Sequence, residues 1–383
     1  MGGVLEGLRV VDLSTGIPAG FAARLLADNG ADVIKVESPA GDVLRQDIYD
    51  FVYCNMGKRS VVLDLEDGDA RAALDVVLDR ADVVIESCDA AGRERYGLDP
   101  DRLRAGRETL IVISVTPFGG SGPYRDWRGS EHVLYGMGHE MYATGQPDLP
   151  PGPLAPYVSW LTIGFSAAVV TVAAMYGVAN GQGGSHYDIS GFEAMAASID
   201  RRAHALVAYA YCGDPLTRGG TPEMFPPHAN PCADGWVSVA AGGLWWEPFC
   251  RVVGLPELAE FRTAPAVGTV PEDVHAAWRN WCSTRTKREI SDLFQGAGVP
   301  SEPMNTMADL LRDDHLRSRS FFKGVDVEDS AGMVPGPIVR LGGPEQDAWP
   351  AAPRLGEHTT EVLREAGVDE RWIMRLTAQE ATA

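Results

Sequence analysis

The chain has few basic residues for its size. Its 383 residues include 33 Lys and Arg against 53 Asp and Glu, which gives a formal net charge of −20 at pH 7. Nucleic acids and anionic membranes are bound by clustered positive charge, so we expect neither as a partner. Any anionic substrate would need basic side chains gathered locally against this overall charge.

Cysteine and long apolar runs are also scarce. The six cysteines show no C-x-x-C spacing, which favours reduced thiols over disulfides or a zinc site. The longest apolar stretch, Ile163–Val178, contains Ser, Thr and Gly and is too short to predict a transmembrane helix. The N-terminus lacks the pattern of a signal peptide. We therefore predict a cytoplasmic protein without a metal site.

The first part of the chain alternates between strand and helix patterns. A short apolar strand, Leu8–Leu13, leads through a turn rich in Gly and Pro to a helix over Phe21–Asn29, and a second strand follows at Ala31–Val36. The alternation continues to Val115. This order predicts an α/β fold with a Rossmann-like, doubly wound parallel sheet.

The pattern changes near residue 225. Residues 225–325 combine a short strand, Val237–Ala241, with several amphipathic helices, which predicts a smaller α+β domain. We expect residues 1–224 to form the large α/β domain and residues 326–383 to be a C-terminal segment that returns to it.

Eight short motifs then define a resemblance. They are Gly7–Ser14, Leu25–Glu37, Asn55–Val61, Phe118–Tyr124, Asp188–Ser190, Asp234–Trp236, Gly298–Pro300 and Leu355–Thr359. In this order they make the chain similar to the class III CoA-transferase (CaiB/BaiF) family, which also includes α-methylacyl-CoA racemase. The resemblance implies an interlocked dimer and transfer of CoA between carboxylic acids. Coenzyme A would be a substrate, with no tightly bound cofactor.

The catalytic motif of that family is incomplete here. Family members carry a nucleophilic Asp in Asp-x-x-x-Gly, whereas this chain has Trp160 four residues before Gly164. A carboxylate forms acyl anhydride and thioester intermediates, and an indole does not. Glu131 matches an acidic residue that the family places near its nucleophile and is the remaining candidate, with a loop cap or ion pair as the alternative. Ser130 replaces the His of the racemases, which disfavours their chemistry.

The resemblance also indicates a CoA site. Lys35, Arg45, Lys58 and Arg59 match basic positions that the family keeps near the CoA cleft. The alternative is that Lys35 and Arg45 form structural ion pairs with Glu37 and Asp42.

Three functions remain open. The favoured hypothesis is the Asp-less, catalytically deficient subunit of a heteromeric CoA-transferase, whose partner is a paralogous subunit bearing the Asp, in a hetero-dimer or hetero-tetramer. The second is an interlocked homodimer that acts on acyl-CoA through Glu131 or by direct exchange. The third is a non-enzymatic scaffold or binding protein. The sequence does not indicate the acyl donor or acceptor.

Overall fold

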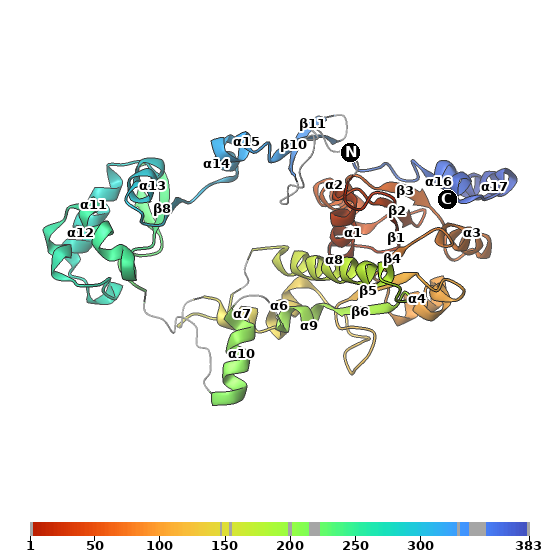
Figure 1. Cartoon of the computed structure of the whole chain (residues 1–383), viewed down its shortest axis with the longest axis horizontal. Coiled ribbons are helices and arrows are strands. Elements are labelled where there is room, and N and C mark those ends of the chain that lie inside the picture. Colours follow the sequence, from red (N-terminus) through yellow and green to blue (C-terminus); the bar gives the residue numbers. More distant parts are fainter. Residues whose placement is uncertain are drawn as a thin grey trace. The chain divides into compact units, whose positions relative to one another are not determined.

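The computed structural model describes residues 3–145, 148–152, 155–197, 201–213, 223–327, 330–336 and 350–380. The chain divides into two compact units (Figure 1). Unit 1 contains Met1–Arg218 and Ser320–Ala383, and unit 2 contains Gly219–Arg319. The small domain was expected at residues 225–325.

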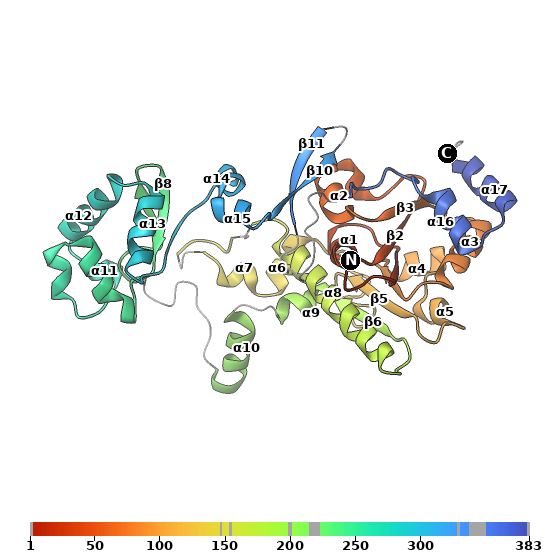
Figure 2. The ribbon, with the colours of Figure 1, turned by 45° about the horizontal axis from the view of Figure 1, so that its top comes forward.

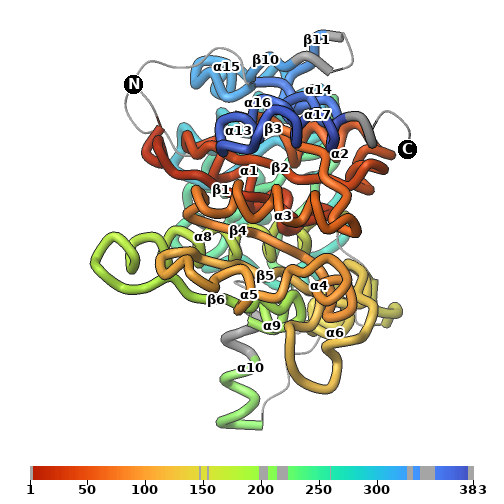
Figure 3. Tube along the Cα trace, turned by 90° about the vertical axis from the view of Figure 1, so that its right-hand side faces the viewer, coloured from red at the N-terminus to blue at the C-terminus, as the bar shows by residue number. Residues whose placement is uncertain are grey.

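Unit 1 is built on a sheet of six parallel strands. They are β1 (Arg9–Asp12), β2 (Asp32–Glu37), β3 (Arg59–Val62), β4 (Val83–Glu86), β5 (Ile111–Thr116) and β6 (His186–Ser190). Their order is β3-β2-β1-β4-β5-β6, as Figure 3 shows from top to bottom. The chain therefore reverses its direction of travel across the sheet between β1 and β4, where such folds form ligand clefts. The predicted fold class is confirmed.

Alternate side chains of each strand enter different cores. Val10 of β1 packs in the core that contains helix α1 (Ile17–Asp28) and helix α8 (Val158–Ala179). Val11 packs in the core that contains α3 (Gly68–Leu78) and α16 (Thr359–Ala366). Successive residues of a strand point to opposite faces. The sheet is thus covered by helices on both faces, and the middle residues of its central strands β1, β4 and β5 are mostly apolar and buried. The edge strand β6 alternates exposed and partly buried residues.

Shorter elements complete unit 1. They are η1 (Val43–Gln46), α2 (Ile48–Asn55), α4 (Ala90–Tyr96), α5 (Pro100–Arg104), α6 (Glu131–Met137), α7 (Glu140–Ala143), α9 (Gly191–Ala196), α10 (Arg201–Cys212), the antiparallel hairpin of β10 (Phe322–Val327) and β11 (Ser330–Pro335), and α17 (Glu370–Glu380). The C-terminal segment returns to β3, where the Val62 N–H donates to Thr359 Oγ1 at 3.0 Å and the His358 N–H donates to the Ser60 carbonyl at 2.9 Å.

Helix α8 has 22 residues, and by length and composition it could cross a membrane, a test that core helices of soluble proteins also pass. One face lies beside α1 (Figures 1 and 2). At Gly164 the helices approach so closely that a Cβ would lie 2.6 Å from the Pro18 carbonyl oxygen. The other face exposes an apolar stripe of Phe165, Val169, Val172 and Tyr176, whose spacing follows the helix repeat.

Unit 2 contains an antiparallel sheet in the order β7-β8-β9. Its elements are β7 (Asn230–Cys232), β8 (Gly235–Val239), η2 (Gly243–Trp245), α11 (Trp246–Val253), η3 (Pro256–Glu260), η4 (Val267–Thr269), α12 (Glu272–Ser283), α13 (Lys287–Gly296), β9 (Ser301–Pro303), α14 (Met307–Arg312) and α15 (Asp314–Ser318). Trp278 lies at the centre of its core, between Phe249 and Trp281, and donates its indole N–H to Asn230 Oδ1 at 2.7 Å.

The first prediction concerns this core. Trp278→Ala should lower the free energy of unfolding by about 3–5 kcal/mol, because it leaves a large cavity and an unpaired amide oxygen on Asn230. Trp245→Ala is the control, since this indole is exposed and its loss should cost about 1 kcal/mol or less. Urea denaturation of the full chain followed by circular dichroism measures both. Equal losses in the two variants would contradict the assignment of Trp278 to the core.

Candidate functional site

A cavity of about 340 Å³ opens at the carboxyl ends of the central strands. Its wall is formed by the β1–α1 connection and first turn of α1 (Thr15–Ala19), Leu44 of η1, Ser87 after β4, residues 115–117 at the end of β5, and Trp160 and Ile163 of α8. This is the edge of the sheet at which the strand order reverses. The cavity therefore occupies the position where doubly wound folds bind ligands.

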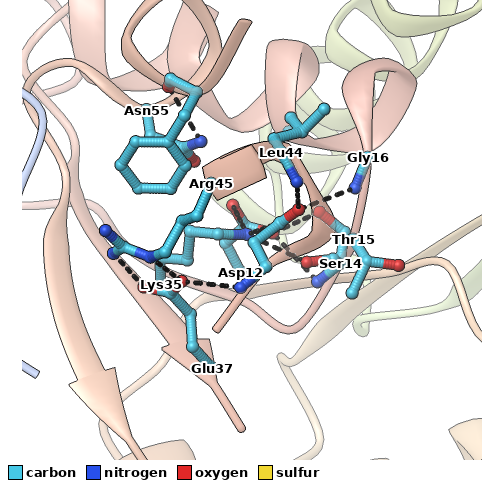
Figure 4. Close-up of polar contacts among 12 residues, drawn as sticks. Asp12, Ser14, Thr15, Gly16, Lys35, Glu37, Leu44, Arg45 and Asn55 are labelled. Carbon is cyan, nitrogen blue, oxygen red and sulfur yellow. Dashed lines mark hydrogen bonds and ion pairs between the residues drawn. The ribbon is translucent and has the colours of Figure 1, made fainter. Parts of the chain in front are cut away.

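A buried ion cluster holds the β1–α1 connection in place. Asp12, at the end of β1, is fully buried and accepts hydrogen bonds from Lys58 Nζ at 2.7 Å and from the Ser14 N–H at 3.0 Å. Lys35 Nζ lies 2.7 Å from Asp42 Oδ2 and donates to the Ser14 carbonyl at 2.9 Å (Figure 4). The cluster thus joins four segments, β1, β2, the loop before η1 and the loop before β3, to the start of the cavity wall.

The same cluster fixes the far end of the connection. Lys58 Nζ donates to the carbonyl of Gly20 in α1 at 2.8 Å and to Asn55 Oδ1 at 2.9 Å. Gly16, the residue before α1, has φ 80°, a backbone conformation that glycine adopts more readily than other residues. Its N–H donates a hydrogen bond to Asp42 Oδ1 at 3.4 Å. Both ends of the segment 14–20 are therefore held by buried ammonium groups.

The charges of this cluster sustain one another. Burial alone would raise the pKa of Asp12, but the neighbouring Lys35 and Lys58 ammonium groups hold it below its usual value. Burial would likewise lower the pKa of Lys35, but Asp12 and Asp42 raise it above its usual value. For Lys58, burial prevails over its pairing with Asp12, and the pKa is lowered.

The four basic residues expected at the CoA site all contact carboxylates of the protein. Besides the two buried lysines, Arg45 makes a two-bond pair with Glu37, with both distances 2.7 Å, and its guanidinium lies 3.9 Å from the centre of the Phe51 ring. Arg59 pairs in the same way with Asp32, at 2.9 and 2.7 Å, and also contacts two glutamates of α16. The structural alternative named Glu37 and Asp42 as the partners of Lys35 and Arg45, and the structure pairs Lys35 with Asp42 and Arg45 with Glu37. A phosphate-binding role for the four residues stays a prediction.

Glu131 caps the helix that carries Trp160. Its two carboxylate oxygens accept from the Tyr157 N–H at 2.9 Å, the Ser159 N–H at 3.2 Å and the Ser159 hydroxyl at 2.9 Å. These N–H groups lie at the start of α8, where a carboxylate is stabilised by the helix dipole. Glu131 itself does not line the cavity. The sequence placed Glu131 near residue 160, and its capping bonds are the loop cap considered as the alternative.

Trp160, the third residue of α8, is half-buried and packs beside the cluster of Ile17, Phe21 and Leu44. It borders the cavity together with apolar side chains and the hydroxyl residues Thr15, Ser87 and Thr116. The wall contains no carboxylate, amine, guanidinium, imidazole or thiol. The described lining therefore holds polar groups that bind by hydrogen bonds, and no group that forms an acyl anhydride.

Two of these hydroxyls were not anticipated from the sequence. Ser87 Oγ accepts the Thr15 N–H at 2.9 Å and donates to the Thr15 carbonyl at 3.2 Å, which ties the β4 end to the β1–α1 connection. Thr116 Oγ1 is buried without a hydrogen-bond partner. The available signal was their position directly after, or at the end of, a predicted parallel strand.

Comparison with known proteins agrees with this architecture. A doubly wound large unit with a cavity at the sheet switch point is joined by a smaller α+β unit. The profile described as CoA-transferase family III matches residues 5–359, and the chain belongs to this family. It is 32% identical to a succinate–glutarate CoA-transferase of Agrobacterium fabrum, with 96% of each chain covered. It is 31% identical to a succinyl-CoA:mesaconate CoA-transferase of Haloarcula marismortui, with 96% of this chain and 97% of the relative covered.

The fold is also similar to a solved structure. A CaiB/BaiF family protein from Brucella suis superimposes with a TM-score of 0.84 at 27% identity, covering 96% of this chain and all of the other.

The second prediction tests the ion cluster. Asp12→Asn should lower the free energy of unfolding by about 3–5 kcal/mol near pH 7, because it leaves buried ammonium charge without its partner. Because the pKa of Asp12 is lowered in the folded state, the charged Asp12 stabilises the fold fully above its unfolded pKa near 4, and this stabilisation is lost as the pH falls through the folded pKa. The difference in free energy of unfolding between the unaltered protein and Asp12→Asn should therefore be constant from about pH 5 to 7 and become smaller below about pH 4.

The control is Asp126→Asn, which removes an exposed carboxylate paired with Arg125 and should cost about 1 kcal/mol or less. Thermal and urea unfolding at several pH values measure these differences. An Asp12→Asn protein as stable as the control variant at pH 7 would contradict a structural role for the cluster.

Proposed function

We propose that this chain is the Asp-less subunit of a heteromeric class III CoA-transferase, acting on acyl-CoA thioesters and carboxylic acids in the cytoplasm. The observation that carries the proposal is the cavity wall. It lies at the sheet edge where such folds bind ligands, Trp160 stands where the family nucleophile is expected, and none of the described residues that line it is a carboxylate. All six cysteines are free thiols. This supports the proposed cytoplasmic location, because thiols stay reduced in the cytosol.

In this proposal the chemistry takes place on the partner's aspartate. That carboxylate attacks the carbonyl of the donor acyl-CoA, so that the C–S bond breaks and an acyl anhydride and CoA thiolate form. The thiolate attacks the aspartyl carbonyl of the anhydride and releases the donor acid, which leaves an enzyme thioester. The acceptor carboxylate then takes the place of the donor in the reverse sequence. This chain contributes a folded partner surface and an acyl-binding cavity.

The surface of α8 supports a partner chain. The stripe of Phe165, Val169, Val172 and Tyr176 is apolar and exposed in unit 1, and contiguous exposed apolar patches mark association sites. We assign this face of α8 as the surface that binds the Asp-bearing paralogue. Two relatives have names that describe subunits: a succinyl-CoA–L-malate CoA-transferase beta subunit of Chloroflexus aurantiacus, 31% identical, and the succinyl-CoA:(R)-benzylsuccinate CoA-transferase subunit BbsE of Thauera aromatica, 28% identical.

Coenzyme A enters as a substrate. Among the four predicted CoA contacts, the side chains of Arg45 and Arg59 are 21% and 19% exposed, whereas Lys35 and Lys58 are buried. The arginines can therefore share a phosphate while keeping their carboxylates. The lysines would have to leave a buried ion pair, which is costly. We assign the outer phosphate contacts to the arginines and a supporting role to the lysines.

The alternative is an interlocked homodimer that uses Glu131 as its reactive carboxylate. Its bonds to the Tyr157 and Ser159 N–H groups place it within one residue of Trp160 along α8. The same bonds occupy both oxygens and reduce their nucleophilicity. A scaffold without CoA chemistry is the third possibility. It would bind the paralogue or another partner, but neither the chain nor its complex with the paralogue would transfer CoA.

The third prediction concerns assembly. The purified chain should not be a stable monomer of 41.1 kDa, and co-expression with an Asp-bearing paralogue should give a soluble complex. Val169→Glu should weaken that complex by about tenfold or more, because it buries an unpaired charge in the interface. The matched control is Val4→Glu, since Val4 and Val169 are 65% and 67% exposed. Light scattering and titration of the subunits measure both, and a monodisperse monomer or equal effects of the two variants would contradict the prediction.

The fourth prediction concerns covalent chemistry. Incubated with an acyl-CoA and then hydroxylamine, the isolated chain should form no hydroxamate on Glu131. Trp160→Asp should gain a weak hydroxamate adduct at residue 160. The new carboxylate would lie in the first turn of α8, where the helix dipole favours its charged and nucleophilic form. The stability loss of this variant should be below the roughly 3–5 kcal/mol of a fully buried Trp.

Trp160→Asn is the control, since it opens the same space without a nucleophile. Mass spectrometry of the digested protein locates the adducts. A hydroxamate on Glu131 of the unaltered chain would replace the heteromer proposal with the homodimer.

A further inference from the structure

We infer that the cavity beside Trp160 selects the acyl group of an apolar or aromatic monocarboxylic acid and rejects dicarboxylic acids. The inference rests on the proposed function, in that it assigns this cavity to an acyl group. It goes further by naming the substrate class. It also separates this chain from two of its relatives, whose names specify succinate with glutarate and succinyl-CoA with mesaconate.

The absence of positive charge from the wall carries the first step. A dicarboxylic acyl group brings a second carboxylate, which stays charged at neutral pH and needs a cationic or multiply hydrogen-bonded partner when it is buried. The described lining has no Lys, Arg or His. Beneath it, the Lys35 and Lys58 ammonium groups are already bound to Asp42 and Asp12. A distal carboxylate would therefore be desolvated without a partner.

The apolar walls carry the second step. Trp160 and Ile163 come from α8, Pro18 from α1, Leu44 from η1 and Pro117 from the end of β5, so apolar side chains enter from several elements. The cavity volume of about 340 Å³ lies at the lower end of the range of volumes found for small-molecule pockets. An indole face favours a flat or aliphatic group by stacking and area burial.

The few polar groups favour one carbonyl or carboxyl end. The first turn of α1 has no side-chain cap, and N–H groups at a helix start attract negative charge or a carbonyl oxygen. Thr116 belongs to the same wall, and its buried hydroxyl has no hydrogen-bond partner among the described residues. The N–H groups at the helix start suit a carbonyl or carboxylate oxygen of the ligand, and its remaining atoms then meet the apolar side chains.

The test is binding to the full chain, alone and in complex with the paralogue, by isothermal titration calorimetry. The probes are 3-phenylpropionate and hexanoate against succinate and glutarate. Trp160→Ala should weaken phenylpropionate at least about tenfold and hexanoate less, because only the aromatic ring loses a stacking partner.

A charge-gain pair gives the specificity test. Ser87→Arg puts a guanidinium on the rim of the cavity and should raise succinate affinity by about tenfold. Ala90→Arg is the matched control, because it adds the same charge at an exposed position just outside the wall and should leave succinate binding unchanged. Circular dichroism establishes that both variants are folded.

The outcomes separate the inference from the function beneath it. Tighter binding of phenylpropionate than of succinate, reversed or narrowed by Ser87→Arg alone, supports the inference. Equal or tighter binding of succinate by the unaltered chain overturns it and leaves the CoA-transferase proposal standing. If no acid binds to the folded chain or its complex while the complex transfers CoA, the acyl site lies elsewhere and the inference fails. If the complex also transfers no CoA, the proposed function fails with it.

Discussion

The structure of the site depends on two lysines that never reach solvent. Lys35 and Lys58 bind the carboxylates of Asp42 and Asp12 and the carbonyls of Ser14 and Gly20. Four separate segments, β1, β2, the loop before η1 and the loop before β3, are joined in this way. Such a cluster stabilises only when its geometry satisfies every charge, and removal of one member leaves the others buried and unpaired. The position of the cavity wall is therefore set by electrostatics beneath it.

Helix α8 combines two features of the proposal. Its first turn is held by Glu131 and presents Trp160 to the cavity, while its outer face carries the exposed apolar stripe. In the proposed Asp-less subunit the helix start would still be needed, because the same turn positions Trp160 in the cavity wall. The cap by Glu131 is consistent with that proposal.

The sequence predicted the sheet better than the site. Alternating short apolar runs and helix patterns suffice for a doubly wound fold, since the central strands β1, β4 and β5 are buried on both faces and leave a short apolar run in the sequence. The motif Gly7–Ser14 contains Asp12, and the motifs Leu25–Glu37 and Asn55–Val61 contain Lys35 and Lys58, but their mutual pairing depends on strand order. The cap of α8, Glu131, is the first residue of α6 and lies 28 residues before Ser159 in the chain. The resemblance placed Glu131 near residue 160, but its hydrogen bonds to the start of α8 depend on how the two helices pack.

The return of the C-terminal segment has a consequence for synthesis of the chain. The edge of β3 is hydrogen-bonded by His358 and Thr359, and α16 covers α3 beside it. Those partners leave the ribosome only after all of unit 2, which forms its own core from one continuous segment. Since domains fold as units during translation, unit 2 can complete its core before the segment with His358, Thr359 and α16 has been made. During that time the β3 edge of the larger sheet has no partner from this segment. The β3 edge of the sheet is thus protected only after the last segment of the chain has been made, and an unpaired strand edge can pair wrongly in the meantime.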